Sequence, residues 1–410
     1  MDQNLPLVLL FGVIVIATTV IRQVCLRLGA QPLVGFVMVG LAVGLAGQVM
    51  GLLTPGLREQ LDLLGQIGVV ILLFKVGLNS DITGLARQLR RAMAIWFSDV
   101  AVSAAVGFMT AFYLLGYGLL ASLFVAVAMS ATSIGISTAA WEQARRLGSD
   151  DGSLLVDVAE LDDISAILLM VLLFTAAPIL ANGDTIDLGV ILTRELAWIL
   201  AKLALFAVSV YLFARHAERA FTRASQARGT LTVAVTGIAC VIAGLAALIG
   251  FSPAIGALFA GLAFSRDPEE FQIDQQLEPV YQLLSPFFFV VVGLSFELAS
   301  ASTALATALV LLVAAVVGKL VGAGLPAMLM LGVRRGWLLG ISMVPRAEIA
   351  MIVMLQGTRL GADYVPAELL GAMSLIVVTT SLLVPLGLGR LLPVANNGGR
   401  MRPRTDNIDS

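Results

Sequence analysis

The chain has 410 residues, of which 59% are hydrophobic and 13% are charged, and its mean hydropathy is +0.97. This composition excludes an ordinary soluble protein, and the formal net charge of −2 argues against nucleic-acid partners. Cys25 and Cys240 lie in apolar segments without metal-ligand spacing, so we expect them to be small core residues. We therefore expect an all-α polytopic membrane protein embedded in the lipid bilayer.

Hydropathy predicts about thirteen transmembrane helices. The first is expected to be a retained span rather than a cleaved signal, because no basic residue precedes it. The ninth and tenth helices are expected to be short or interrupted, by Pro253 and by Ser285-Pro286 respectively. The predicted spans are 5–27, 32–53, 60–80, 92–117, 119–143, 153–181, 188–214, 227–249, 252–265, 280–298, 302–331, 336–358 and 366–394.

The basic residues predict the orientation. With the N-terminus outside, the inward-facing helix ends and loops contain eighteen arginines, whereas the outward-facing side contains three, Arg58, Arg194 and Arg359. Membrane proteins concentrate positive residues on the cytoplasmic side in this way. We expect the N-terminus outside and the C-terminus, with a disordered tail at 395–410, in the cytoplasm.

The fifth span contains a polar run, residues 130–138, half-way along its length. The run is rich in Ser, Thr and Gly, which predicts a central interruption of this helix. Thr132 and Ser133 are candidate ion ligands, through their hydroxyls or through the backbone around them. The alternative is that these hydroxyls only bond to carbonyls of their own helix, which is a common role for such residues.

Asp162 and Asp163 stand side by side in the sixth span. If that helix enters the bilayer near Ser153, a rise of about 1.5 Å per residue puts the pair roughly 15 Å deep. A hydrocarbon core is about 30 Å thick, so the pair lies near the midplane. An ionised carboxylate there costs at least about 2.5–3.5 kcal/mol unless it faces water, a proton or a cation. We expect a site that protons or cations neutralise.

Three further charges are expected at the same depth. Lys319 lies half-way along the eleventh span, and Arg346 and Glu348 follow Pro345 half-way along the twelfth. Interrupted helices at matching places in two halves of a chain indicate the binding site of a transporter. Such breaks leave free carbonyls and amides and opposed helix dipoles, which these three charges are expected to compensate.

Several assignments have plain structural alternatives. The alternative for the aspartate pair is a structural ion pair that holds two helices together. We favour the ion site over this alternative, because Lys319 alone does not neutralise two carboxylates. Lys319 itself is either a structural partner of Asp162 or a participant in the exchange of protons.

Other charged residues are harder to assign. Glu160 and Asp157 either line a cytoplasmic funnel that leads to the pair or are charges near the interface. Lys75 is expected to extend its amine toward the cytoplasmic surface, with Asp99 as a candidate partner. Lys202 lies deep in the seventh span, and the sequence offers no account of it.

Several short segments together carry a family resemblance. In their order along the chain, they resemble the bacterial monovalent cation:proton antiporters of the second cation:proton antiporter family. The resemblance covers nearly all of residues 1–394. The matching segments are 64–74, 76–78, 130–136, 162–163, 286–289, 292–294, 318–319 and 345–348.

The resemblance implies a sodium/proton antiporter fold of inverted repeats, in which two broken helices cross. It implies a homodimer in a bacterial inner membrane. It also implies that Asp163 is the principal cation and proton ligand and that Asp162 alternates between Lys319 and the ion. Lys75 and Ala347 depart from the family pattern, which usually has an apolar residue and glycine there. The implied division is scaffold helices at 1–91 and 226–300, an ion-binding core at 92–182 and 301–394, a linker helix at 183–225 and the tail.

The aspartate pair also bears on the transported ion. The potassium-efflux branch of the family typically has Gln-Asp at this place, followed by a soluble nucleotide-binding domain, whereas here both positions are acidic and a short tail follows the last span. We expect electrogenic exchange of Na+ (or Li+) for H+ by alternating access, with Asp163 and Asp162 holding the Na+ and with no cofactor besides the transported ions.

Four other functions are alternatives. The nearest is a K+/H+ antiporter of the same family. A Na+-coupled organic-solute symporter would need a polar substrate cavity beyond the ion site, and the sequence shows no such cluster. A channel would not need broken helices around a charge-paired midplane. A membrane enzyme would need a nucleophile or a metal triad, and we expect no enzymatic activity.

Overall fold

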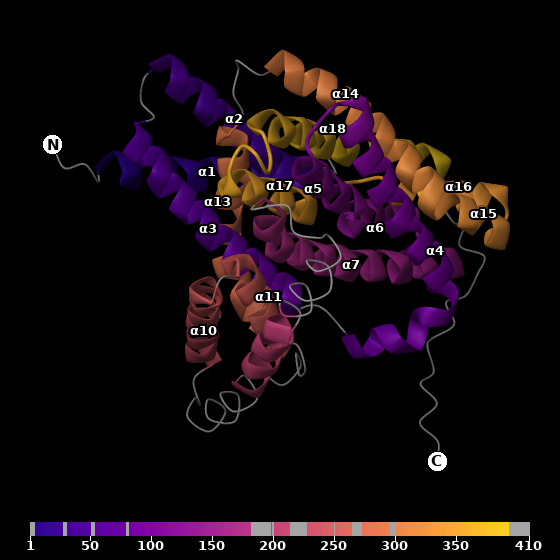
Figure 1. Ribbon diagram of the computed structural model, residues 1–410, viewed down its shortest axis with the longest axis horizontal. Coiled ribbons are helices and arrows are strands. Elements are labelled where there is room, and N and C mark those ends of the chain that lie inside the picture. The colour runs from indigo at the N-terminus through magenta and orange to yellow at the C-terminus, as the bar shows by residue number, and fades with distance from the viewer. Residues whose placement is uncertain are drawn as a thin grey trace.

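A computed structural model describes residues 5–27, 31–50, 54–78, 82–181, 198, 201–213, 228–249, 251–264, 273–295 and 301–392. Within these ranges every regular element is helical (Figure 1). The linker helix predicted at 183–225 lies outside them apart from 198 and 201–213, and the tail predicted at 395–410 lies outside them entirely. The expected all-α fold is thus confirmed for the part of the chain that the structure describes.

One group of helices packs through α3 and α13. α13 lies against α2 and α3, and α11 lies against α3 and α10. Glycines permit these close approaches: a Cβ at Gly261 would lie 2.1 Å from the carbonyl oxygen of Phe74, and one at Gly293 would lie 2.2 Å from that of Val37. The members of this group are α1 (Leu5–Arg27), α2 (Pro32–Met50), α3 (Pro55–Leu78), α10 (Arg228–Leu248), α11 (Pro253–Phe264) and α13 (Ile273–Leu294).

A second group packs around α4, α7 and α14, and its elements α15 and α16 lie on the right in Figure 1. Two of its spans contain a π-helical turn, η1 after α4 and η4 after α14. The members are α4 (Ile82–Met109), η1 (Thr110–Leu114), α5 (Leu119–Ser130), α6 (Ile134–Gln143), α7 (Asp150–Ala181), α14 (Ala301–Lys319), η4 (Leu320–Gly324), α15 (Leu325–Leu331), α16 (Val333–Ser342), α17 (Glu348–Leu360) and α18 (Ala367–Leu391).

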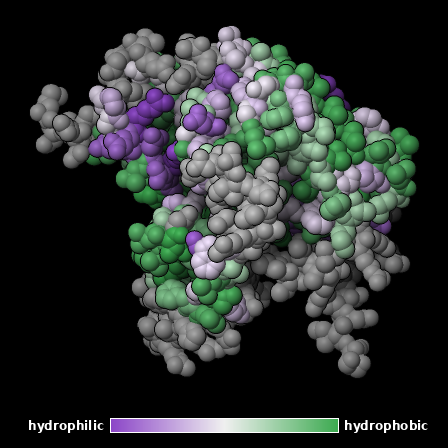
Figure 2. Space-filling view, in the orientation of Figure 1, coloured by the Kyte–Doolittle hydropathy of each residue, from purple (hydrophilic) through white to green (hydrophobic). Residues whose placement is uncertain are grey.

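The surface has the apolar character that a bilayer requires. Six of the described helices are long and apolar enough to cross a membrane, and others are apolar but shorter. Large apolar side chains point outward along them, such as Leu9 and Ile16 on α1, and apolar residues cover much of the face seen in Figure 2. The protein is therefore a membrane protein.

Two spans are broken at mid-length, as predicted. The fifth consists of α5 and α6, separated by residues 131–133, and the backbone of Ala131 and Ser133 is extended. The twelfth consists of α16 and α17, separated by residues 343–347. Each half-helix is 10 to 13 residues long, which is too short to span a bilayer alone.

The two breaks cross and hydrogen-bond to each other. The amide of Ser133 donates to the carbonyl of Pro345 at 2.8 Å, and the hydroxyl of Thr132 donates to the carbonyl of Met343 at 3.3 Å. Further along, the indole of Trp141 donates to the hydroxyl of Ser342 at 2.8 Å. Backbone groups that the breaks free are therefore satisfied by the opposite chain segment, as an apolar medium demands.

The predicted interruption of the tenth span is wrong. α13 runs without a break from Ile273 to Leu294, through both Pro279 and Pro286. Membrane helices tolerate proline where neighbouring helices pack against the freed backbone groups, and α2 and α3 pack along α13. The ninth span is short, as expected, because α11 begins at Pro253, where the missing N–H costs no helical hydrogen bond.

Candidate functional site

The two adjacent aspartates of α7 have different surroundings. Asp162 is fully buried, whereas Asp163 is half-buried and makes no hydrogen bond or ion pair with the residues that the structure describes. Consecutive residues of a helix point about 100° apart, so one of the pair faces inward and the other faces a more accessible side. The arrangement thus has one fully buried carboxylate and one that is partly exposed.

Lys319 occupies the buried side. Its Nζ lies 3.0 Å from Oδ2 of Asp162, 2.7 Å from Oδ2 of Asp99 and 2.8 Å from the carbonyl oxygen of Ser130. An ammonium has three N–H donors, so all of them are used. The side chains of Lys319, Asp99 and Asp162 are all 0% exposed. One buried cation therefore serves two buried carboxylates, which come from α4 and α7.

The pairing suggested between Asp99 and Lys75 is wrong. Lys75 forms an ion pair with Glu278, and its ammonium lies 4.3 Å from the centre of the Tyr281 ring. The reason is depth: Lys75 is in the last turn of α3, while Asp99 on α4 faces α14 at the level of Lys319. The sequence does contain a signal for the Asp99–Lys319 pair, because a buried acid needs a buried base and Lys319 is a base at mid-span.

The charges around the crossing sit at the ends of half-helices. The fully buried Arg346 donates through Nη1 to the carbonyl of Ala131, and Lys319 donates to that of Ser130. Both carbonyls lie at the C-terminal end of α5, where the helix dipole is negative. Glu348 is the first residue of α17, at the positive end of that helix. The half-helix dipoles are thus compensated by basic side chains at the negative end of α5 and by an acidic residue at the positive end of α17.

The polar residues of the break in the fifth span are buried in the crossing. The hydroxyl of Thr132 bonds to Met343 of the opposite break, so bonding within its own helix does not describe it. Ser133 contributes its amide to the crossing. Oxygen lone pairs on both side chains remain available to a cation, and their role as ligands stays a prediction.

Residues 13–393 match the family model described as "Sodium/hydrogen exchanger, transmembrane". The chain belongs to this family. The exchanger is 25% identical over 379 residues to the Na+/H+-K+ antiporter GerN of Bacillus cereus, an alignment that covers 91% of the chain and 93% of GerN. It is also 25% identical over 378 residues to a Na+/H+ antiporter of Enterococcus hirae, covering 91% of the chain and 94% of that protein.

A solved structure has the same fold as the exchanger. The sodium proton antiporter MjNhaP1 from Methanocaldococcus jannaschii matches with a TM-score of 0.68, covering 95% of this chain and 99% of its own. The sequence identity is 14%, so the likeness concerns the fold. It confirms the sodium/proton antiporter fold that was expected from the sequence.

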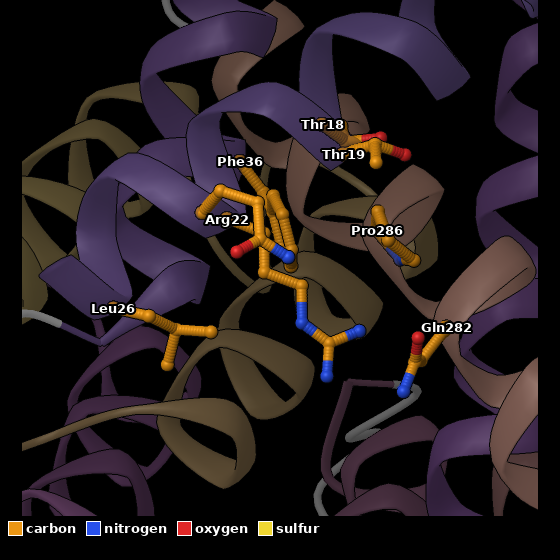
Figure 3. A pocket seen from close by; sticks show the side chains of 8 residues that line it. Thr18, Thr19, Arg22, Leu26, Phe36, Gln282 and Pro286 are labelled. Atoms are coloured by element: carbon orange, nitrogen blue, oxygen red, sulfur yellow. The ribbon is translucent and has the colours of Figure 1, made fainter.

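The exchanger contains two adjoining cavities beside α1, α2 and α13. One has a volume of about 280 Å³ and the other about 150 Å³, and Arg22, Phe36, Gln282 and Pro286 line both. Figure 3 shows the Arg22 guanidinium extending into the space beside Gln282. The second cavity reaches Glu348, so together they connect the end of α1 with the crossing of the broken helices.

A charge cluster stands at the α1 end of these cavities. Glu278 lies 3.7 Å from Arg22, pairs with Lys75 and accepts a hydrogen bond from Gln282 at 2.6 Å. By the predicted orientation, this is the cytoplasmic end of α1, α3 and α13.

The remaining charges in question lie elsewhere. Glu160 is exposed and Asp157 is half-buried on α7, and neither lines the two cavities above, so their place in a funnel stays a prediction. Lys202 is exposed, and its ammonium lies 5.5 Å from the centre of the Trp198 ring. An ammonium that faces an indole ring gains a favourable cation–π contact.

Proposed function

We propose that this exchanger moves Na+ (or Li+) in one direction and H+ in the other, with Asp163 and Asp162 as the shared ligands. The observation that carries the proposal is the contrast within the pair: Asp163 is partly accessible and unpaired, while Asp162 is held by Lys319. A proton or a cation at Asp163 neutralises the open carboxylate, and the two compete for the same oxygens. Exchange follows from this competition without a further coupling device.

The buried aspartate has an oxygen to offer as well. Oδ1 of Asp162 is buried and has no hydrogen-bond partner in the part of the chain that the structure describes. Leaving a buried acceptor unsatisfied is unfavourable, and a cation between the two aspartates would satisfy it. Carboxylate oxygens are suitable ligands for a hard cation such as Na+. Thr132 and Ser133, or the backbone beside them, complete the proposed ligand set.

Alternating access is proposed to result from movement of one helix group against the other. The group around α4, α7 and α14 would act as the mobile core and that around α3 and α13 as the scaffold, which would also form a homodimer. Release of more than one proton per cation, from Asp163 and from either Asp162 or Lys319, would make the exchange electrogenic. The proposed location is a bacterial inner membrane, with the N-terminus outside.

A K+/H+ antiporter is the second candidate, because one relative of similar length is named for both Na+ and K+ exchange. Purified protein in acid-loaded proteoliposomes separates the two: Na+, Li+ and K+ are added in turn while internal pH is followed. We expect Na+ and Li+ to restore the pH at lower concentrations than K+. Restoration by K+ at the lowest concentration would select the second candidate, and no response to any of the three would refute antiport.

A further inference from the structure

Asp99 has no part in the proposed exchange, although it lies nearer to Lys319 than Asp162 does, at 2.7 Å against 3.0 Å. We propose that Asp99 is a positioning residue that holds Lys319 while the cation occupies Asp162, and that it thereby sets the apparent affinity for the cation. The inference rests on the proposed function, because it assumes that the cation uses the oxygens of Asp162.

The hydrogen bonds of Lys319 show what Asp99 contributes. When a cation takes Asp162, Lys319 loses one of its three acceptors and keeps the carboxylate of Asp99 and the carbonyl of Ser130. Without Asp99, the ammonium would have only the carbonyl in a fully buried site. A buried charge without a counter-charge is strongly unfavourable. Asp99 thus makes the release of Asp162 from Lys319 easier and favours binding of the cation.

Asp99 is held next to the helix that carries Lys319. A Cβ at Gly322 would lie 2.9 Å from Cα of Asp99 and 3.2 Å from its Oδ1, so α4 approaches this turn as closely as glycine allows. Gly318, on the other side of Lys319, likewise faces Ser103 of α4. Lys319 is followed directly by the π-helical turn η4, and such turns are frequent at functional sites. Asp99 and Lys319 are therefore held in contact by backbone packing, independently of Asp162.

The placement of the two carboxylates also fits this role. Lys319 contacts both Asp99 and Asp162, but only Asp162 is adjacent to the partly exposed Asp163. If Asp99 served stability alone, its loss would affect folding and leave cation affinity unchanged. If it positions Lys319, its loss changes cation affinity.

The test uses Asp99→Asn, which keeps the size of the side chain and leaves the Lys319 ammonium paired with the carboxylate of Asp162. In proteoliposomes at fixed pH we expect the KM for Na+ to rise about tenfold, with the maximal rate per folded protein within about twofold of wild type. Asp99→Glu, which retains the charge, should restore most of the affinity. The matched control is Ser103→Ala: it removes the 3.3 Å hydrogen bond to Oδ1 of Asp99 and leaves Oδ2 on Lys319, and its KM should be that of wild type.

A second measurement identifies the route through Lys319. Na+ binding is followed by the rise in melting temperature with Na+ in detergent, which needs no transport, for Lys319→Gln alone and for Lys319→Gln combined with Asp99→Asn. Their Na+ affinities should differ much less than those of wild type and Asp99→Asn, because no ammonium is left to position and only the direct electrostatic effect of Asp99 on the cation remains. This pair of variants also serves if Asp99→Asn alone does not fold.

The outcomes are distinct. A KM for Na+ in Asp99→Asn that equals the wild-type value overturns the inference. The inference is also overturned if Asp99→Asn lowers Na+ affinity by the same factor in the wild-type and the Lys319→Gln backgrounds, because Asp99 would then act on the cation directly. Failure of wild-type protein to respond to Na+, Li+ or K+ would instead refute the proposed function.

Discussion

The dependence of Na+ affinity on pH is the sharpest consequence of the proposed site. If protons and Na+ compete for the same carboxylates, the apparent dissociation constant for Na+ must rise as pH falls below the apparent pKa of the site. The number of displaced protons sets the slope, at about tenfold per pH unit for each proton, because one pH unit is a tenfold change in proton concentration.

The structure indicates which slope to expect. Asp162 is ion-paired with Lys319, whereas Asp163 has no ion pair with the residues that the structure describes, so Asp163 is expected to hold at least one competing proton. Asp163 alone gives about a tenfold change per pH unit, so the electrogenic exchange proposed above predicts a steeper slope. A slope that approaches a hundredfold would mean that Asp162 or Lys319 also gives up a proton when Na+ binds.

The assay is Na+ binding by calorimetry or by thermal shift at four or more pH values, with wild type and Asp162→Asn compared. If the wild-type slope is steeper than tenfold and falls to tenfold in Asp162→Asn, the second proton belongs to Asp162. If the steeper slope persists in Asp162→Asn, the second proton belongs to Lys319. Na+ affinity that is independent of pH in the wild type would overturn the antiport mechanism itself.

Three further perturbations test individual parts. Asp163→Asn should abolish Na+-driven proton movement in everted vesicles while the protein stays folded. The control Glu142→Gln, at an exposed residue, should retain this activity. Substantial activity of the Asp163→Asn variant would refute the assignment of Asp163 as the principal ligand. Lys319→Ala leaves two buried carboxylates unpaired and should cost about 3–5 kcal/mol of stability, measured by thermal unfolding, against little change for the exposed Lys202→Ala. Equal melting temperatures for those two would contradict the buried network. Gly261→Ala should lower the melting temperature because its Cβ would lie 2.1 Å from the Phe74 carbonyl oxygen, while Gly237→Ala, with open space around it, should not; the same shift in both would refute the tight α3–α11 contact.

The position of the broken helices could be predicted from the sequence, because the cause of each break is local. A run of Ser, Thr and Gly interrupts the fifth span and a proline interrupts the twelfth, each at the depth where intramembrane charges also occur. Such patterns are independent of the packing around them. The same local rule failed for α13, where Pro286 leaves the helix continuous, because there the neighbouring helices decide the outcome.

The partners of the buried charges could not be predicted in the same way. Counting residues along a span gives the depth of a side chain but not the direction in which its helix is rotated. Whether Asp99 meets Lys319 depends on which face of α4 packs on α14, and that contact depends on the glycines at 318 and 322. The cavity that reaches Glu348 is likewise formed by four helices, α1, α2, α13 and α17, from distant parts of the sequence.

The network around Lys319 also bears on how the site could change its accessibility. A single ammonium on α14 connects α4 through Asp99, α5 through Ser130 and α7 through Asp162, and the crossing ties α5 and α6 to α16 and α17. Rotating one of these helices alone would break buried charge-assisted hydrogen bonds, which are among the stronger interactions available in an apolar interior. Sliding the whole group past α3 and α13 breaks none of them. These contacts support the proposed alternating access, in which the helix group that carries the site would move as one body against the group around α3 and α13.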